Sequence, residues 1–220
     1  MFARLLLLVL MAALPAAAQD YAREKRWADE VVPGLVVGDA VWLETSAGRK
    51  FLAIHAPASK PRGAVILVHG IGIHPDYGMI GVLRSKLTDL GWTTLSIQMP
   101  VQAADARFKD YTPPLFEEAS DRIGKAAAWL AAKGDPRIAL VSHNGTVLLF
   151  LAHLLALPLP LVWCGFYSWP ASVSTIHFEE HSDAWAAPRA LCVADTSHLR
   201  SAGLEPQPRG MGAGLYEPYR

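Results

Sequence analysis

The chain has 220 residues, of which 52% are hydrophobic and 18% are charged, and its formal net charge at pH 7 is zero. This composition is that of an ordinary globular protein with room for one hydrophobic core. The balance of charge excludes the basic excess of a nucleic-acid-binding protein and the acidic run of a solvating tail.

The first 18 residues have the pattern of a targeting signal. Arg4 precedes a short apolar run, Leu5–Leu14, and Ala16–Ala18 supplies a small-residue ending. The pattern predicts a signal peptide over residues 1–18, cleaved after Ala18, and therefore an exported protein that is periplasmic or secreted, with no membrane association after cleavage. The alternative is an uncleaved membrane anchor, although the run is shorter than the roughly 20 residues that span a bilayer.

A polar N-terminal segment over residues 19–34 is followed by two expected strands. Leu35–Leu43 and Lys50–His55 are joined by turn residues, Thr45–Gly48, which predicts an N-terminal hairpin. Ala64–His69 is an uninterrupted apolar run, as expected of a strand buried on both faces.

Strands and helices then alternate along the chain. Helical spacing or composition predicts helices at Met79–Leu90, Leu115–Lys133 and Val147–Leu157, and apolar runs predict strands at Trp92–Gln98, Arg137–Val141, Leu161–Phe166 and Ala190–Ala194. The alternation predicts an α/β fold with a mostly parallel sheet and helices on both faces, forming one domain over residues 35–200. Residues 201–220 show no periodicity and are expected to be an irregular tail.

The loop that follows the buried strand at Val68 is the first candidate site. Its sequence from His69 to Asp76 contains two glycines, which let a backbone approach a ligand closely. Ligands bind open parallel sheets at the carboxyl ends of the strands. We therefore expect the N–H groups of Ile71 or Gly72, together with that of Gly145, to form an oxyanion or ligand-binding site. A plain tight turn is the alternative.

The second candidate site is the turn after the strand that ends at Val141. The sequence Ser142-His143-Asn144-Gly145-Thr146 follows a strand and precedes a helix, as the G-x-S-x-G nucleophile turn does, and places Asn144 at the nucleophile. Asparagine has no hydroxyl, so the position is degenerate, but asparagine tolerates the positive φ that such a turn requires. Ser142 and Thr146 are the candidate substitute nucleophiles, and an ordinary Asn-Gly turn is the alternative.

The remaining triad members are incomplete. Asp195 follows the last expected strand and is the candidate acid, whereas His198 is the only later histidine and lies just three residues on. The acid and the histidine of a triad come from separate loops, so His198 is a poor fit. His177 and His181 lack the H-E-x-x-H order, so no metal site and no cofactor is expected.

The two cysteines, Cys164 and Cys192, both lie in apolar runs. An oxidising compartment permits a disulfide between them, and the other interpretation is two buried small hydrophobic residues.

These residues together resemble the alpha/beta-hydrolase superfamily. More narrowly, Val68–Gly78, Ile80–Arg84 and Gly91–Pro100, continued by Arg137–His143, are similar to an exported bacterial family of uncharacterised proteins with that fold. The resemblance implies an alpha/beta-hydrolase-like sheet without an established substrate, and a serine where Asn144 stands. It also implies a further strand and a distal histidine, so we expect the domain to be truncated at its C-terminus.

Three hypotheses about function follow. The first is a catalytically impaired hydrolase-like protein that binds a small acyl or ester compound. The second is a weak esterase that uses a substitute nucleophile, for instance the aspartate that deamidation of Asn144 would produce. The third is a truncated or frameshifted product without a function.

Overall fold

The structure is a computed structural model that describes residues 19–104, 113–135, 137–182 and 185–206. The predicted signal peptide and residues 207–220 of the expected tail lie outside the described residues. The chain divides into two compact units, of which the first ends at Val141 and the second begins at Ser142.

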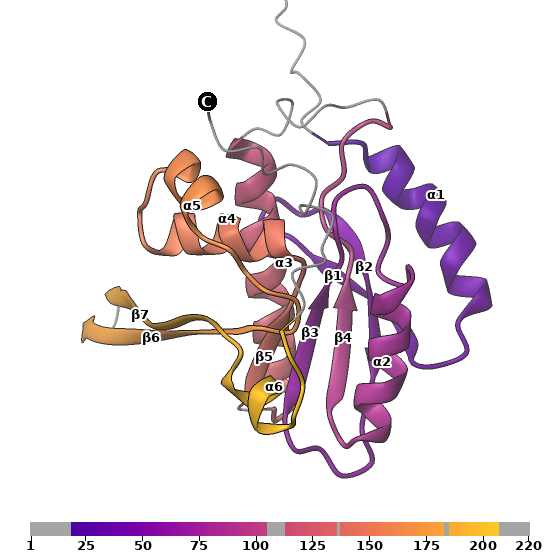
Figure 1. Ribbon diagram of the computed structural model, residues 1–220. Coiled ribbons are helices and arrows are strands. Elements are labelled where there is room, and N and C mark those ends of the chain that lie inside the picture. The colour runs from indigo at the N-terminus through magenta and orange to yellow at the C-terminus, as the bar shows by residue number, and fades with distance from the viewer. Residues whose placement is uncertain (1–18, 105–112, 136, 183–184, 207–220) are drawn as a thin grey trace, which may run out of the picture. The chain divides into compact units, whose positions relative to one another are not determined.

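The first unit is built on a five-stranded sheet (Figure 1). Its strands are β1 (Asp39–Glu44), β2 (Lys50–Ala56), β3 (Ala64–Val68), β4 (Thr93–Ile97) and β5 (Ile138–Val141), in the order β1-β2-β4-β3-β5. β3 pairs in parallel with β4 and β5, whereas β2 is antiparallel to both of its neighbours, so four of the five strands run in one direction. The prediction of a mostly parallel α/β sheet with an N-terminal hairpin is confirmed.

Helices cover both faces of this sheet (Figure 1). They are α1 (Tyr21–Val31), α2 (Met79–Asp89) and α3 (Pro113–Ala132). All of β3 is buried, and its side chains alternate between the faces: Ile66 packs in the cluster with Ala126 and Leu130 of α3, and Leu67 packs with Ile80 of α2. The apolar run was read correctly as a strand because burial on both faces requires no polar alternation.

The hairpin begins later than its sequence suggested. β1 starts at Asp39 rather than Leu35, because Val32–Gly34 form a short 3-10 helix and Gly38 has φ 80°. A Cβ at Gly38 would lie 2.7 Å from the carbonyl oxygen of His55, so glycine is required where the chain enters the sheet.

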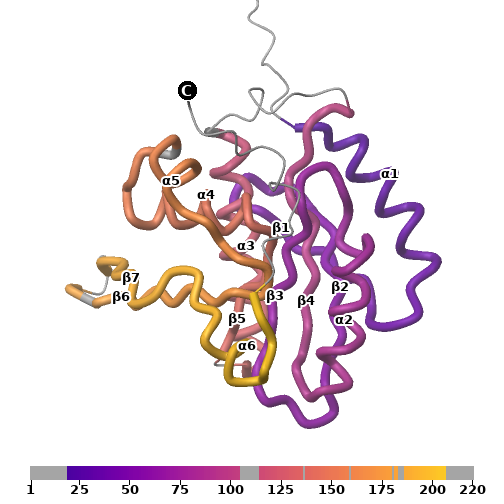
Figure 2. Tube along the Cα trace, in the orientation of Figure 1, coloured from indigo at the N-terminus to yellow at the C-terminus, as the bar shows by residue number. Residues whose placement is uncertain are grey.

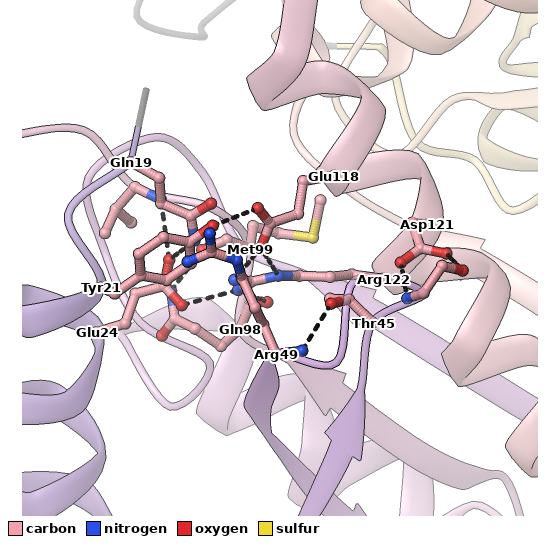
Figure 3. A network of polar contacts seen from close by, with 12 residues as sticks. Gln19, Tyr21, Glu24, Thr45, Arg49, Gln98, Met99, Glu118, Asp121 and Arg122 are labelled. Atoms are coloured by element: carbon pink, nitrogen blue, oxygen red, sulfur yellow. Dashed lines mark hydrogen bonds and ion pairs between the residues drawn. The ribbon is translucent and has the colours of Figure 1, made fainter. Parts of the chain in front are cut away.

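The polar segment after residue 18 contains a helix that the sequence analysis left unassigned. Asp20 caps α1 by accepting a hydrogen bond from the Arg23 N–H at 2.9 Å. The helix then inserts Glu24 beside Arg122 of α3, which is fully buried (Figure 3). A charged side chain of α1, that of Glu24, is therefore buried in the interior. Helices are predicted from apolar spacing, which α1 lacks on this face, and α1 was therefore not predicted.

Arg122 is the centre of a buried polar cluster that we call the Arg122 cluster. Its guanidinium donates to Glu24 Oε2 at 2.9 Å, to the Gln98 carbonyl oxygen at 2.9 Å and to Glu118 Oε1 at 2.7 Å (Figure 3). Tyr21 donates its hydroxyl to Glu118 Oε2 at 2.7 Å, and burial together with this carboxylate raises the pKa of Tyr21 to about 12. The cluster joins α1, α3 and the chain after β4.

The described residues of the second unit form three helices and a separate two-stranded sheet. Its elements are α4 (Asn144–Leu154), α5 (Leu159–Gly165), β6 (Val173–Ser182), β7 (Trp185–Asp195) and α6 (Ser197–Ser201). β6 and β7 run antiparallel as a long ribbon (Figure 2). A small core of its own unites α4 and α5 with the ribbon through Leu151, Val162, Ile176 and Val193.

Several predictions for this unit are wrong. Leu161–Phe166 is not a strand, because α5 occupies Leu159–Gly165 with proline in its first turn, a position that proline favours. Ala190–Ala194 is strand as predicted, but β7 pairs with β6 in its own antiparallel sheet and not within the parallel one. Cys164 and Cys192 are both free, and Cys164 is exposed rather than buried.

None of the helices in the described ranges is both long enough and apolar enough to cross a membrane.

Candidate functional site

The glycine loop, which we define as residues 69–78, leaves the carboxyl end of β3 and leads into α2. His69 anchors its start and is only 2% exposed. His69 Nε2 accepts the Met99 N–H at 2.9 Å and lies 3.1 Å from Gln98 Nε2, while Nδ1 lies 2.7 Å from the Gly70 carbonyl oxygen. An acceptor at Nε2 and a carbonyl at Nδ1 assign the proton to Nδ1. The imidazole therefore ties the ends of β3 and β4 together, and its two nitrogens are engaged in structure.

The far end of the glycine loop is held by side chains of α2 and β4. Arg84, which is 4% exposed, contacts Asp76 and the Val37 carbonyl oxygen, and Ser96 donates to the Pro75 carbonyl oxygen. These contacts fix both ends of the loop and leave its middle free to meet a ligand.

The middle of the loop presents the predicted N–H donors. Ile71 is 54% exposed, and Gly72 takes the left-handed conformation with φ 76°. Within the described part of the chain, neither the Ile71 nor the Gly72 N–H donates a hydrogen bond. Two unused donors on a loop fixed at both ends suit a carbonyl or carboxylate oxygen. Their role as a binding site stays a prediction.

Aromatic side chains of the glycine loop and of α1 lie close together. The His74 ring lies 5.6 Å from the Tyr77 ring in an edge-to-face arrangement and 5.9 Å from the Trp27 ring of α1, measured between centroids. Arg23 places its guanidinium 4.6 Å from the Trp27 ring. These residues were not predicted to be neighbours, because nothing in the sequence of α1 indicates which loop the helix packs beside.

His74 gives the loop a predicted dependence on pH. Burial lowers the pKa of His74 from 6.5, against the opposing effects of Asp76 and Glu30. The unfolded chain therefore binds a proton more readily than the folded chain, and stability present above the unfolded pKa is lost as pH falls below it. We expect urea unfolding midpoints of wild type to fall between about pH 7.5 and pH 5.5, and His74→Asn to reduce that slope.

The matched control for this experiment is His177→Asn, since His177 is exposed on β6. It should leave the slope unchanged. Burial likewise lowers the pKa of His55, so part of the slope remains in the His74 variant. Identical slopes for wild type and His74→Asn would contradict the prediction.

The predicted nucleophile turn has the expected order but not the expected strain. β5 ends at Val141, two residues follow, and α4 begins at Asn144 with His143 as its N-cap. Neither Asn144 nor Gly145 has a positive φ, so the expectation of a strained turn at Asn144 is wrong. Asn144 instead occupies the first helical position, where a short polar side chain is ordinary.

Gly145 allows a close approach inside the second unit. A Cβ at Gly145 would lie 3.3 Å from the Trp163 ring of α5, so a larger residue would press on that ring. Glycine at this position thus has a packing role, and its role as an oxyanion donor stays a prediction.

Asp195 and His198 lie together at the end of the ribbon. Asp195 accepts hydrogen bonds from the Ser197 N–H at 2.9 Å and from the Ser197 hydroxyl at 2.7 Å. These bonds, with a smaller contribution from His198, hold the pKa of Asp195 below its usual value. The carboxylate therefore shapes the turn into α6, which contains His198. No hydrogen bond in the described residues joins either residue to Asn144.

The residues that the structure describes contain no cluster of three or more His, Cys, Asp or Glu side chains that could hold a metal ion. His177 and His181 lie exposed on β6, and His181 is 3.9 Å from Glu179.

The fold and loop define a mixed α/β protein with a glycine loop at the carboxyl edge of a mostly parallel sheet. A family model described as "Protein of unknown function (DUF3530)" matches residues 2–119, which is 118 of the 220 residues. The chain belongs to this family. A second model, for the histidine phosphatase superfamily (branch 1), matches residues 94–189, less than half of the chain, and overlaps the first over residues 94–119.

Solved structures similar to this chain include esterases and another alpha/beta hydrolase. Est1E from Butyrivibrio proteoclasticus, with ferulic acid bound, is 22% identical with a TM-score of 0.41, over 52% of this chain and 47% of its own. Esterase Est22 is 16% identical with a TM-score of 0.41, over 64% of this chain and 48% of its own. An alpha/beta hydrolase from Novosphingobium aromaticivorans is 17% identical with a TM-score of 0.35, over 55% and 41%. The chain spans about half the length of these proteins or less. No curated protein matches it.

Proposed function

We propose that this chain is an exported, non-catalytic alpha/beta-hydrolase-like protein that binds a small acyl or ester compound at its glycine loop. The observation that carries the proposal is the pair of N–H donors at Ile71 and Gly72, which find no acceptor among the described residues and lie on a loop whose two ends are fixed. A carboxylate or carbonyl oxygen is the group that such donors bind.

The absence of catalysis is supported by chemistry at the nucleophile position. Asn144 cannot attack a carbonyl as serine does, and its helical backbone lacks the strained conformation that lifts a nucleophile above a sheet. Asp195 is engaged with Ser197 at the turn into α6. A weak esterase would need a nucleophile and a base, and the contacts of Asn144 and Asp195 described above supply neither.

A chain without a function is the second candidate. In the described sheet β5 is an edge strand with the apolar sequence Ile138–Val141, and exposed edges of this kind promote association. The family match also ends at residue 119, before both β5 and the second unit. A single cooperative thermal transition, with the ligand response described below, would rule this candidate out.

Binding is tested with butyrate as the probe, because it offers a carboxylate and a short acyl chain. We expect saturable NMR shifts centred on the Ile71 and Gly72 amides. Tyr77 is exposed on the same loop and supplies a nearby reporter. No shift at millimolar butyrate, or shifts centred elsewhere, would contradict the proposed site.

Catalysis is tested with p-nitrophenyl butyrate. Wild type, Asn144→Ala and Asn144→Ser should hydrolyse this ester at the same background rate, because no hydrogen bond among the described residues joins Asp195 or His198 to position 144. The Asn144→Ala variant is the matched control, since it removes the side-chain amide alone. A gain of more than about 100-fold in Asn144→Ser, the scale of an added general base, would show that a working triad exists.

A further inference from the structure

Gln19 would be the first residue of the exported protein, and its side chain lies beside the Arg122 cluster (Figure 3). Its amide nitrogen, Nε2, donates to Glu24 Oε1. Its amide oxygen, Oε1, is buried and has no hydrogen-bond partner among the described residues. The neighbouring backbone is also held, since the Asp20 N–H donates to the Val101 carbonyl oxygen at 2.7 Å.

An N-terminal glutamine can react with itself. The uncharged α-amine attacks Cδ of its own side chain and forms a five-membered lactam. The bond between Cδ and Nε2 breaks, and Nε2 leaves as ammonia with the proton that the α-amine gives up. The products are pyroglutamate and ammonia, so no oxidant, reductant or co-reactant is needed.

The surroundings of Gln19 favour two requirements of this reaction, an uncharged amine and a path for a proton to the leaving nitrogen. Glu24 is only 7% exposed, and this burial raises its pKa in spite of Arg122. Such surroundings disfavour a charged ammonium, and the uncharged amine is the nucleophile. Glu24 Oε1 already accepts a hydrogen bond from Nε2, the atom that must leave, so the carboxylate is positioned to take the proton that the α-amine gives up and pass it to Nε2.

We propose that, once the chain is cut after Ala18, Gln19 cyclises to pyroglutamate beside Glu24, which assists the departure of ammonia. The inference rests on the export proposal above. Lactam formation removes a terminal charge next to the buried carboxyl group of Glu24 and makes the terminus resistant to aminopeptidases.

The test uses the full chain, expressed in an exporting Gram-negative host and purified from the periplasm. Mass spectrometry of the N-terminal peptide should find a chain that begins at residue 19 and is lighter by one ammonia than the uncyclised peptide. Freshly exported protein should cyclise faster when folded than when held unfolded in urea. Glu24→Gln should slow the folded reaction by roughly 100-fold, the lower range for loss of a group that takes up and passes on a proton.

Gln19→Asn is the matched control, because it keeps an amide but cannot close the five-membered lactam. A chain that begins at Gln19 and keeps its free amine after prolonged incubation would overturn the inference and leave the export proposal intact. A folded rate no greater than the unfolded rate would overturn the role of Glu24 even if Glu24→Gln folds poorly. A terminus elsewhere, or an uncleaved chain, would overturn both proposals.

Discussion

Replacement of Arg122 by methionine is expected to lower the free energy of unfolding by about 3–5 kcal/mol, the usual result of removing one partner from a buried ion pair. Arg122 has no exposed surface, and it donates to Glu24, Glu118 and the Gln98 carbonyl oxygen. Its guanidinium also lies 5.0 Å from the Phe51 ring. Methionine keeps much of the packing volume, so the loss comes chiefly from the carboxylates that are left without a cation.

The expected pH dependence distinguishes this cause from a simple packing defect. Burial raises the pKa of Glu24 even in the presence of Arg122, and removal of the guanidinium takes away the strongest opposing interaction. A carboxyl group with a raised pKa destabilises the folded state as pH rises through that value. The deficit of Arg122→Met should therefore shrink toward acidic pH and be largest at neutral pH.

Two variants complete the comparison, which is measured by urea unfolding. Lys25→Met breaks an ion pair with Asp29 that is exposed on both sides, and it should change stability by less than about 1 kcal/mol. Glu24→Gln combined with Arg122→Met removes both charges and should recover part of the loss. Equal losses for Arg122→Met and Lys25→Met would refute the structural importance of the cluster.

The elements of the first unit were predicted well where residues within or next to each element mark where it begins and ends. Ala64–Val68 is continuously apolar, and Met79–Asp89 has helical spacing and ends before Gly91. These sequence signals are local, and the strand and the helix form where the signals predict them. The hydrogen bonds that join α1 to the rest of the Arg122 cluster are not local, because they connect residues as far as 98 positions apart in sequence.

The second unit was predicted less well because short apolar runs do not distinguish a strand from a helix. Leu161–Phe166 was predicted as a strand from its apolar run, whereas proline within the first turn favours the helix that forms. The candidate nucleophile position shows the same limit. The order of strand, turn and helix was predictable, but the conformation of Asn144 depends on where α4 begins, and that is set by packing against α5 and the ribbon.

Removal of the His69 imidazole is expected to damage stability and ligand binding together. His69→Ala leaves the Met99 N–H without its acceptor, separates Gln98 from the ring and opens a cavity at a residue that is 2% exposed. An unsatisfied buried donor and a cavity together cost about 2–4 kcal/mol. The loss should appear as a lower urea midpoint and as faster hydrogen exchange at the Met99 amide.

The His69→Ala variant also tests whether butyrate binding needs the glycine loop to be held by His69, or only needs the loop to be exposed. Because His69 fixes the start of the glycine loop, the butyrate shifts at Ile71 and Gly72 should be lost in His69→Ala even at temperatures where the chain remains folded. His143→Ala is the control, since His143 is exposed and makes no side-chain cap to α4. If folded His69→Ala binds butyrate as wild type does, the prediction is wrong. The positions of the N–H donors at Ile71 and Gly72 would then not depend on the buried imidazole.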